Sequence, residues 1–353
     1  MAEWTTLKPK HGLRRERLTL EGHFWPFVLG LLIARGSMLG YYPFAIGFGA
    51  ALMLYGRKGT ILGLMGVLLG TSSLFMEDLP SVLQILLTLL ILSLVLPRIR
   101  GKKREGLLLF LTVTLFTGII AFLAMGWGKW ELLLSWEVVV FSLLNGAISI
   151  IFWYALCHQE PLWSGNFTRE QGIAWLVILV AIVSGLQGVV LGKFYFSVIL
   201  ITFFILFVAQ RFGPGAAAGV GIMLGFLPQL ALNPLNLMSA GIYGMAGFAT
   251  GAFQRLGKWG LGVAYLGVTL MFTAYLQPEI LSSQLISTLV GLVIFFLFPT
   301  SINKEDFLKE KPLPEVESTV TKVKTVAEIF DQIAYSAQAA EVEVNKSKPE
   351  ISD

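Results

Sequence analysis

Long apolar stretches separated by short polar turns dominate the first 300 residues of the chain. Twelve stretches lie near residues 23–39, 41–56, 59–75, 81–97, 106–126, 133–156, 171–191, 195–210, 214–232, 236–253, 259–276 and 283–299. Their lengths are close to what a helix needs to cross a hydrocarbon core of roughly 30 Å. The short second and third stretches could merge or re-enter, so the pattern predicts about ten to twelve spans. We therefore expect an all-α, polytopic transmembrane helix bundle.

Polar segments flank the apolar region, and they divide the chain into five parts. We expect a basic cytoplasmic leader at 1–22, a transmembrane domain at 23–299, a linker at 300–317, a cytoplasmic amphipathic helix at 318–343 and a polar tail at 344–353. The leader lacks a small-residue cleavage site after the first apolar run, so we interpret it as part of an anchor rather than a cleaved signal.

A narrow apolar stripe runs along the expected helix at 318–343. Its members alternate at steps of three and four residues: Val320, Val323, Ala327, Phe330, Ala334 and Ala337. This spacing is typical of a coiled-coil seam. Because the chain offers this stripe nothing to pack on, we expect it to meet a partner helix or a further domain.

Composition excludes several classes of protein. The chain is 55% hydrophobic and only 14% charged, whereas a soluble globular chain carries roughly 25% charged residues. Cys157 is the single cysteine, which excludes a disulfide scaffold. Lys and Arg stand at the ends of spans without interleaved aromatic residues, a pattern that argues against nucleic-acid binding.

The charges also predict an orientation. The formal net charge is +4, divided into −4 for residues 300–353 and +8 for the rest. With twelve spans and a cytoplasmic start, 16 Lys and Arg fall in short segments on the inside, and only Lys129 and Lys193 fall outside. The positive-inside rule then places both termini in the cytoplasm.

A search for catalytic chemistry finds little. No phosphate loop, nucleophile elbow or metal-ligand spacing is present, and the whole chain holds four aspartates and three scattered histidines. We therefore expect no enzyme, no catalytic or metal-binding residue and no cofactor in this chain.

Two charged residues inside apolar stretches are candidate functional groups. Arg35 stands in the middle of an apolar run, and Glu137 follows Trp136 near the start of another. A charge in the membrane is costly and often marks an ion or substrate contact. The alternatives are that Arg35 snorkels to the interface or pairs with Glu137, and that Glu137 is solvated at the interface.

Glycines four residues apart are candidate helix-packing positions. The pairs are Gly59 and Gly63, Gly66 and Gly70, Gly215 and Gly219, Gly221 and Gly225, and Gly247 and Gly251. Such pairs let two helix backbones approach closely in lipid. Packing within the chain is one interpretation, and self-association through one of the pairs is the other.

Several segments resemble the membrane region of the stage II sporulation protein E family. The run RGSMLGYYPFA from Arg35 is similar to its first hairpin, and REQG from Arg169 followed by SGLQG from Ser184 is similar to a later span. The glycine-rich stretch 213–262 and the closing FPTSI from Phe298 fit the same family. No single motif is specific to this family. The order of the motifs along nearly the whole chain is specific to it.

The resemblance implies a sporulation protein of endospore-forming bacteria. Full-length members join a polytopic membrane region, a central region that self-associates and contacts the division tubulin homologue, and a C-terminal PPM-type serine/threonine phosphatase that uses Mn²⁺ or Mg²⁺. That phosphatase activates the first forespore sigma factor. The metal-binding aspartates of the phosphatase have no counterparts in this sequence, which stops near the start of the central region.

We therefore expect a membrane-anchoring and septum-localising module, present as a short form, a split-gene product or a fragment. Expected partners are membrane lipid, a second copy of the chain, and, by resemblance, the division tubulin homologue and a phosphatase domain or partner. The expected location is the bacterial cell membrane, at the polar septum during sporulation. The alternative is a small-solute transporter or channel, argued from Arg35, Glu137 and proline-broken spans.

Overall fold

The computed structural model describes residues 21–38, 41–56, 59–75, 78–102, 104–125, 136–158, 169–229, 238–276 and 278–298. All of them lie in the first of two compact units into which the chain divides, Met1–Phe298 and Pro299–Asp353. The predicted linker, cytoplasmic helix and polar tail lie outside the described residues, as do the six members of the apolar stripe.

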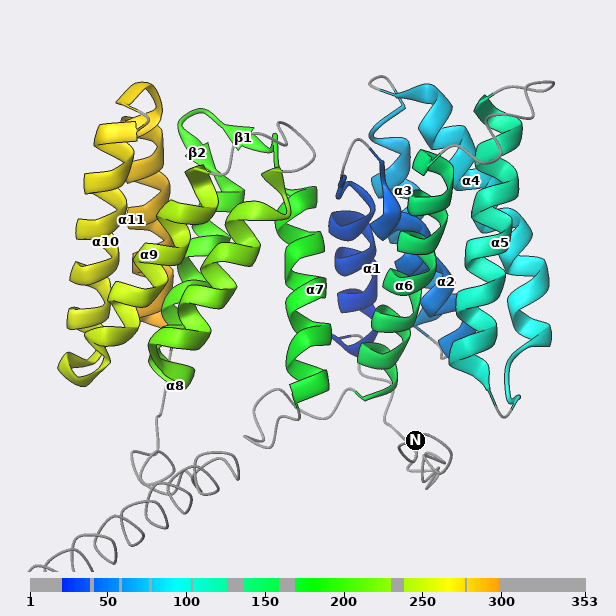
Figure 1. Cartoon of the computed structure of the whole chain (residues 1–353), viewed down its shortest axis with the longest axis horizontal. Coiled ribbons are helices and arrows are strands. Elements are labelled where there is room, and N and C mark those ends of the chain that lie inside the picture. The colour runs from blue at the N-terminus through cyan, green and yellow to red at the C-terminus, as the bar shows by residue number, and fades with distance from the viewer. Residues whose placement is uncertain are drawn as a thin grey trace, which may run out of the picture. The chain divides into compact units, whose positions relative to one another are not determined.

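Seven α-helices and a short 3₁₀ turn form the N-terminal part of this unit (Figure 1). Their bounds are α1 Glu21–Ala34, α2 Pro43–Tyr55, α3 Thr60–Ser72, α4 Leu79–Val95, η1 Leu96–Arg98, α5 Glu105–Met125, α6 Trp136–Cys157 and α7 Arg169–Gly185. Local sequence explains several helix ends. Asp78 accepts a hydrogen bond from the Ser81 amide at 3.2 Å and so caps the start of α4.

A β-hairpin and four further helices complete the described part. Their bounds are β1 Val190–Leu191, β2 Phe194–Tyr195, α8 Phe196–Phe226, α9 Met238–Ala252, η4 Gln254–Leu256, α10 Gly257–Leu276, η5 Pro278–Ile280 and α11 Leu281–Leu297. The hairpin pairs Val190 with Tyr195 and Leu191 with Phe194 in antiparallel register. Its two-residue turn contains Gly192 at φ 64°, where the sequence predicted only a turn around Lys193.

Helix α8 is two helices joined at a break. Gly213 has φ 79° and ψ −169°, and Pro214 follows it, so the helical hydrogen-bond ladder is interrupted there. Figure 1 shows the chain reverse direction at this point, and the second arm runs antiparallel to α9, with Pro214 against Gly251 and Gly225 against Ser239. Counting both arms of α8, the described part has twelve α-helical segments, one for each predicted apolar stretch.

Six helices in the described part are long and apolar enough to cross a membrane: Leu79–Arg98, Glu105–Leu123, Trp136–Cys157, Phe196–Phe226, Gln254–Leu276 and Pro278–Leu297. Their outward faces carry many large apolar side chains. On α4 the outward leucines recur at helical spacing: Leu83, Leu87, Leu90 and Leu94. Lipid accommodates such a surface and water does not. The expected all-α, polytopic bundle is confirmed.

The second and third stretches form separate helices rather than merging. Gly56 ends α2 in the left-handed conformation at φ 56°, which a residue with a side chain adopts only at a cost. Helices α2 and α3 have 13 residues each, about 20 Å of helix at 1.5 Å per residue, and are therefore shorter than a hydrocarbon core. Helix α2 is almost entirely buried.

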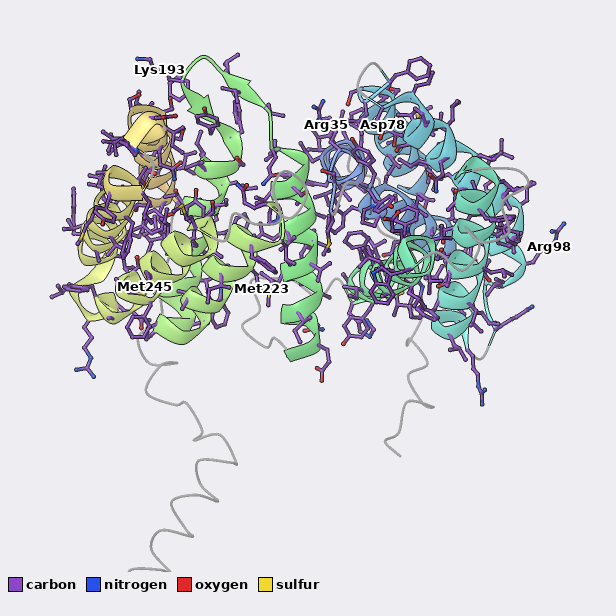
Figure 2. All side chains as sticks on the ribbon, turned by 45° about the horizontal axis from the view of Figure 1, so that its top comes forward. Arg35, Asp78, Arg98, Lys193, Met223 and Met245 are labelled. Atoms are coloured by element: carbon purple, nitrogen blue, oxygen red, sulfur yellow. The ribbon has the colours of Figure 1, made fainter. Side chains whose placement is uncertain are left out.

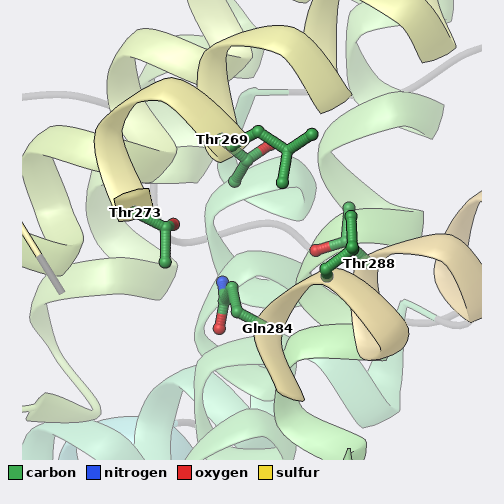
Figure 3. Close-up of a pocket in the computed structure, with 6 residues that line it drawn as sticks. Thr269, Thr273, Gln284 and Thr288 are labelled. Atoms are coloured by element: carbon green, nitrogen blue, oxygen red, sulfur yellow. The ribbon is translucent and has the colours of Figure 1, made fainter. Parts of the chain in front are cut away.

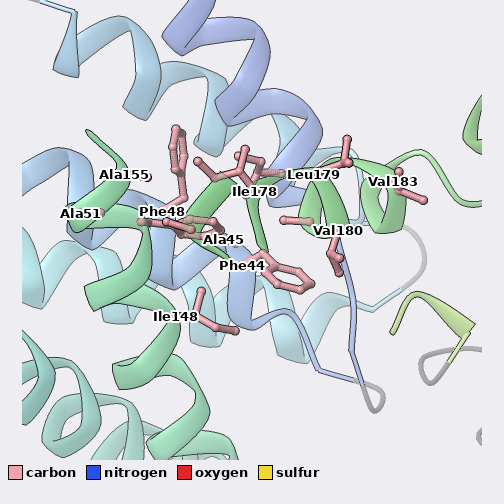
Figure 4. Close-up of a cluster of buried hydrophobic side chains, with 14 of the residues drawn as sticks. Phe44, Ala45, Phe48, Ala51, Ile148, Ala155, Ile178, Leu179, Val180 and Val183 are labelled. Atoms are coloured by element: carbon pink, nitrogen blue, oxygen red, sulfur yellow. The ribbon is translucent and has the colours of Figure 1, made fainter. Parts of the chain in front are cut away.

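Part of the buried core lies where side chains of α2, α6 and α7 come together. Figure 4 shows Phe44, Ala45 and Phe48 of α2 among Ile148 of α6 and Val180 of α7. The Phe48 ring also meets the Phe152 ring edge to face, with centroids 5.5 Å apart, a favoured aromatic geometry. Because α2 contacts neighbours on all sides, it holds the N-terminal helices together.

Candidate functional site

Arg35 lies just past the end of α1, and its guanidinium reaches the end of α3. Its Nη1 donates a hydrogen bond to the Ser73 hydroxyl at 3.0 Å, and that hydroxyl donates to the Gly70 carbonyl at 2.7 Å. The Nε atom is buried without a hydrogen-bond partner. Figure 2 labels Arg35 together with Asp78, which caps the start of α4. Arg35 therefore joins the end of α1 to the end of α3.

Glu137 occupies the first turn of α6 and is exposed. Its carboxylate accepts a long hydrogen bond, 3.5 Å, from the Tyr41 hydroxyl in the loop that joins α1 to α2. The structure thus gives Arg35 and Glu137 different partners, a serine and a tyrosine, and not each other. Arg35 and Glu137 therefore do not form an ion pair with each other.

Four of the ten candidate glycines lie where the second arm of α8 crosses α9. A Cβ on Gly221 would overlap the Tyr243 carbonyl, and one on Gly247 would overlap the Ala217 carbonyl. Gly225 and Gly251 are equally tight, against the Ser239 carbonyl and the Pro214 backbone. The two backbones are therefore in direct contact, as small residues allow in lipid.

Gly215 and Gly219 behave differently, although they have the same spacing on the same arm. A Cβ on either would meet no atom within 4 Å, and both residues are exposed. The structure therefore brings Gly221, Gly225, Gly247 and Gly251 together and leaves Gly215 and Gly219 facing outward.

A second glycine contact joins α1 and α3. Gly63, Gly66 and Gly70 of α3 follow one another along the face that touches α1, where Gly30 lies against the Gly63 carbonyl. A Cβ on Gly66 would overlap the Phe27 carbonyl. This contact sets the spacing between α1 and α3, and so it positions Ser73 beside Arg35.

The helices α8 to α11 enclose a polar core that the sequence analysis missed. The Thr202 hydroxyl donates to the Tyr265 hydroxyl at 3.2 Å, and the Gln284 amide donates to the Tyr243 hydroxyl at 2.9 Å. All four side chains are buried. A signal was present on α11, where Gln284, Ser287 and Thr288 recur at steps of three and one and so share one helix face.

A cavity of about 10 Å³ lies inside this polar core, lined by Thr269, Leu270, Thr273, Gln284, Leu285 and Thr288 (Figure 3). The hydroxyls of Thr273 and Thr288 are buried and have no hydrogen-bond partner. That volume is about the least that admits one water molecule. The cavity is too small for an organic substrate.

Two basic residues cap helix C-termini, which the sequence analysis also missed. Arg100 Nη2 donates to the Gly56 carbonyl at 3.2 Å, at the end of α2. Lys258 Nζ donates to the Phe298 carbonyl at 2.8 Å, at the end of α11. A cation at this position donates to a carbonyl at the helix end and interacts favourably with the helix dipole. Arg98, by contrast, points outward (Figure 2).

Within the described ranges, no group of three or more His, Cys, Asp and Glu side chains lies close enough to hold a metal ion. The chemistry that these residues do supply is packing, helix capping and hydrogen bonding inside an apolar bundle.

Comparison with known proteins identifies the family of this chain. The family model described as SpoIIE, N-terminal domain, matches residues 1–305 of the 353, a range that includes every described helix. No curated protein and no solved structure matches the chain. The family and the six long apolar helices together indicate a multi-pass membrane protein. The chain belongs to the SpoIIE N-terminal domain family.

Proposed function

We propose that this chain is the membrane-anchoring module of a SpoIIE-like sporulation protein and that it directs its cytoplasmic tail to the polar septum. The observation that carries the proposal is the family match over residues 1–305. The architecture supports it, because the buried glycine contacts and the α2 core make a compact bundle. On this proposal the chain scaffolds and does not catalyse.

The proposed orientation puts both termini in the cytoplasm. Support comes from the charges at span ends, where Arg98, Arg169, Arg211 and Arg255 fall on one side of the alternating helices and Lys193 falls on the other. The basic turn from Arg98 to Arg104 would then meet the anionic lipids of the inner leaflet.

The proposed partners bind the tail. The apolar stripe from Val320 to Ala337 would pair with the same segment of a second copy or with a helix of a phosphatase partner. Binding to the division tubulin homologue would localise the chain to the septum. The support is the heptad-like spacing of the stripe together with membership of the family.

A fluorescent fusion placed after Asp353 and imaged through sporulation in the native host tests the proposal. We expect fluorescence concentrated at the polar septum. A matched variant with Val323→Asp and Phe330→Asp would keep the membrane signal and lose the septal enrichment if the stripe docks a partner there. Uniform membrane fluorescence of the unaltered chain would contradict septal anchoring and would favour the transporter alternative.

A further inference from the structure

A second cavity lies at the end of the bundle where α6 begins. It has a volume of about 210 Å³ and is lined by Tyr41, Trp136, Glu137, Val140, Phe141 and Leu144. We call it the Glu137 cavity. Its walls come from the first turns of α6 and from the loop between α1 and α2.

Three of its six lining residues are aromatic. The rings of Tyr41 and Phe141 pack against each other with centroids 4.7 Å apart. Phe141 is buried, and Trp136 is 78% exposed beside the opening. The cavity therefore presents one packed pair of aromatic rings and one exposed aromatic side chain.

The one carboxylate in this wall is not neutralised by a neighbour in the described part of the chain. Glu137 accepts a single hydrogen bond, from Tyr41, which leaves acceptor capacity on its two oxygens. The cation nearest along the α1–α2 loop, Arg35, donates instead to Ser73. The cavity thus combines a negative charge with the faces of aromatic rings.

A carboxylate beside aromatic faces is the combination that binds organic cations. Aromatic faces attract an organic cation through their quadrupole, and a carboxylate adds an opposite charge. We propose that the Glu137 cavity binds an alkylammonium group, with Glu137 as the counter-ion and with Trp136 and Tyr41 as the aromatic contacts. The group has two possible sources, the headgroup of phosphatidylethanolamine and a free small amine.

An ordinary interfacial belt also places Trp and Tyr at the ends of membrane helices. A belt predicts no preference for a cation over a neutral molecule of the same shape, and no dependence on Glu137. This difference decides the experiment. The proposal does not depend on the septal role, because either a scaffold or a transporter could carry such a site.

The test uses the full chain purified in detergent, titrated calorimetrically with choline and with its neutral isostere 3,3-dimethylbutan-1-ol. We expect saturable binding of choline and at least about tenfold weaker binding of the neutral alcohol. Glu137→Gln keeps the shape and removes the charge, so choline affinity should fall by about tenfold or more. Glu170→Gln, in the exposed first turn of α7, is the matched control and should bind as the unaltered chain does.

A second experiment, with lipid, distinguishes the phosphatidylethanolamine headgroup from a free small amine as the bound group. The thermal midpoint is compared in nanodiscs with and without phosphatidylethanolamine, for the unaltered chain and for Glu137→Gln. A stabilisation by this lipid that Glu137→Gln loses, without choline binding in detergent, would assign the site to the lipid headgroup. Should Glu137→Gln fail to fold, Trp136→Leu keeps the charge at an exposed position and should weaken binding severalfold. Equal affinities for choline and the alcohol with no lipid preference, or binding unchanged in Glu137→Gln, would overturn the proposal.

Discussion

Lys258, at the start of α10, closes the end of α11. Its Nζ atom lies 2.8 Å from the Phe298 carbonyl oxygen and 5.7 Å from the centre of the Phe295 ring. One side chain therefore donates to a carbonyl at a helix end and contacts the aromatic core beside it. Because α10 and α11 are neighbours, this contact ties the start of α10 to the end of α11.

Replacing Lys258 by Met should lower the free energy of unfolding by about 0.5–2 kcal/mol, since the aliphatic stem is kept and the charge at the helix end is lost. Thermal unfolding of the purified chain in detergent measures the change. Arg255→Met is the control, because Arg255 is exposed in the preceding 3₁₀ turn. A Lys258→Met midpoint equal to that of the control would show that the cap contributes nothing.

Gly221→Ala should destabilise the chain, and Gly219→Ala should not. A methyl group on Gly221 would overlap the Tyr243 carbonyl, whereas one on Gly219 would meet open space. Forcing an extra carbon into a packed contact costs roughly 1–3 kcal/mol. The two thermal midpoints, measured side by side in detergent, check the prediction. If Gly219→Ala were the more harmful, this outward face would be packed against a second copy of the chain.

Gly185→Ala should weaken the contact between α7 and α1. A Cβ there would overlap the Leu32 carbonyl, next to the hydrogen bond that the Ser184 hydroxyl donates to the Ser37 carbonyl at 2.6 Å. Gly172→Ala on the same helix is the control, with no atom within 4 Å of its Cβ. We expect limited proteolysis of Gly185→Ala to cut faster in the α1–α2 loop. Identical digestion of both variants would count against the contact.

The Gln284 and Tyr243 side chains should be energetically coupled. Gln284→Leu leaves the buried Tyr243 hydroxyl without its donor, which should cost about 1–3 kcal/mol. Tyr243→Phe removes the partner, so the double variant should be less destabilised than the sum of the two single variants. Tyr275→Phe, on an 85% exposed tyrosine, is the control for the loss of a hydroxyl. Strict additivity would contradict a direct bond.

The proposed orientation predicts which turns face the cytoplasm. In a Cys157→Ser background, a cysteine at Lys193 should react with a membrane-impermeant maleimide on intact cells, and one at Arg255 should react only after lysis. The two positions lie at opposite ends of the helices α8 to α11. Labelling of Arg255→Cys on intact cells would reverse the proposed topology.

Local sequence predicts the helices of this protein well because the lipid solvent imposes a local rule. Each apolar stretch must form a helix to satisfy its own backbone, so the twelve stretches and the turns between them could be identified without any knowledge of contacts. Gly213 and Pro214 mark the break in α8 for the same local reason, since the bend depends on their own backbone preferences.

The sequence does not predict which side chains contact each other, as two sets of residues show. Arg35 and Glu137 are the charges that the sequence singles out, yet Ser73 and Tyr41 are their partners. The polar core around Tyr243, Tyr265 and Gln284 went unnoticed, because uncharged polar residues in apolar helices give a weak signal until their common face is known.

The sequence by itself determined the membrane class, the number and approximate limits of the helical segments, and the family resemblance, since these depend on hydrophobicity and on residue order. Only the tertiary structure decided which faces of those helices meet. Gly215 with Gly219 and Gly221 with Gly225 have the same spacing on one helical arm, and only the second pair touches α9. The reason is physical: spacing places residues on one face of a helix, and contacts between segments distant in the sequence decide whether that face is covered.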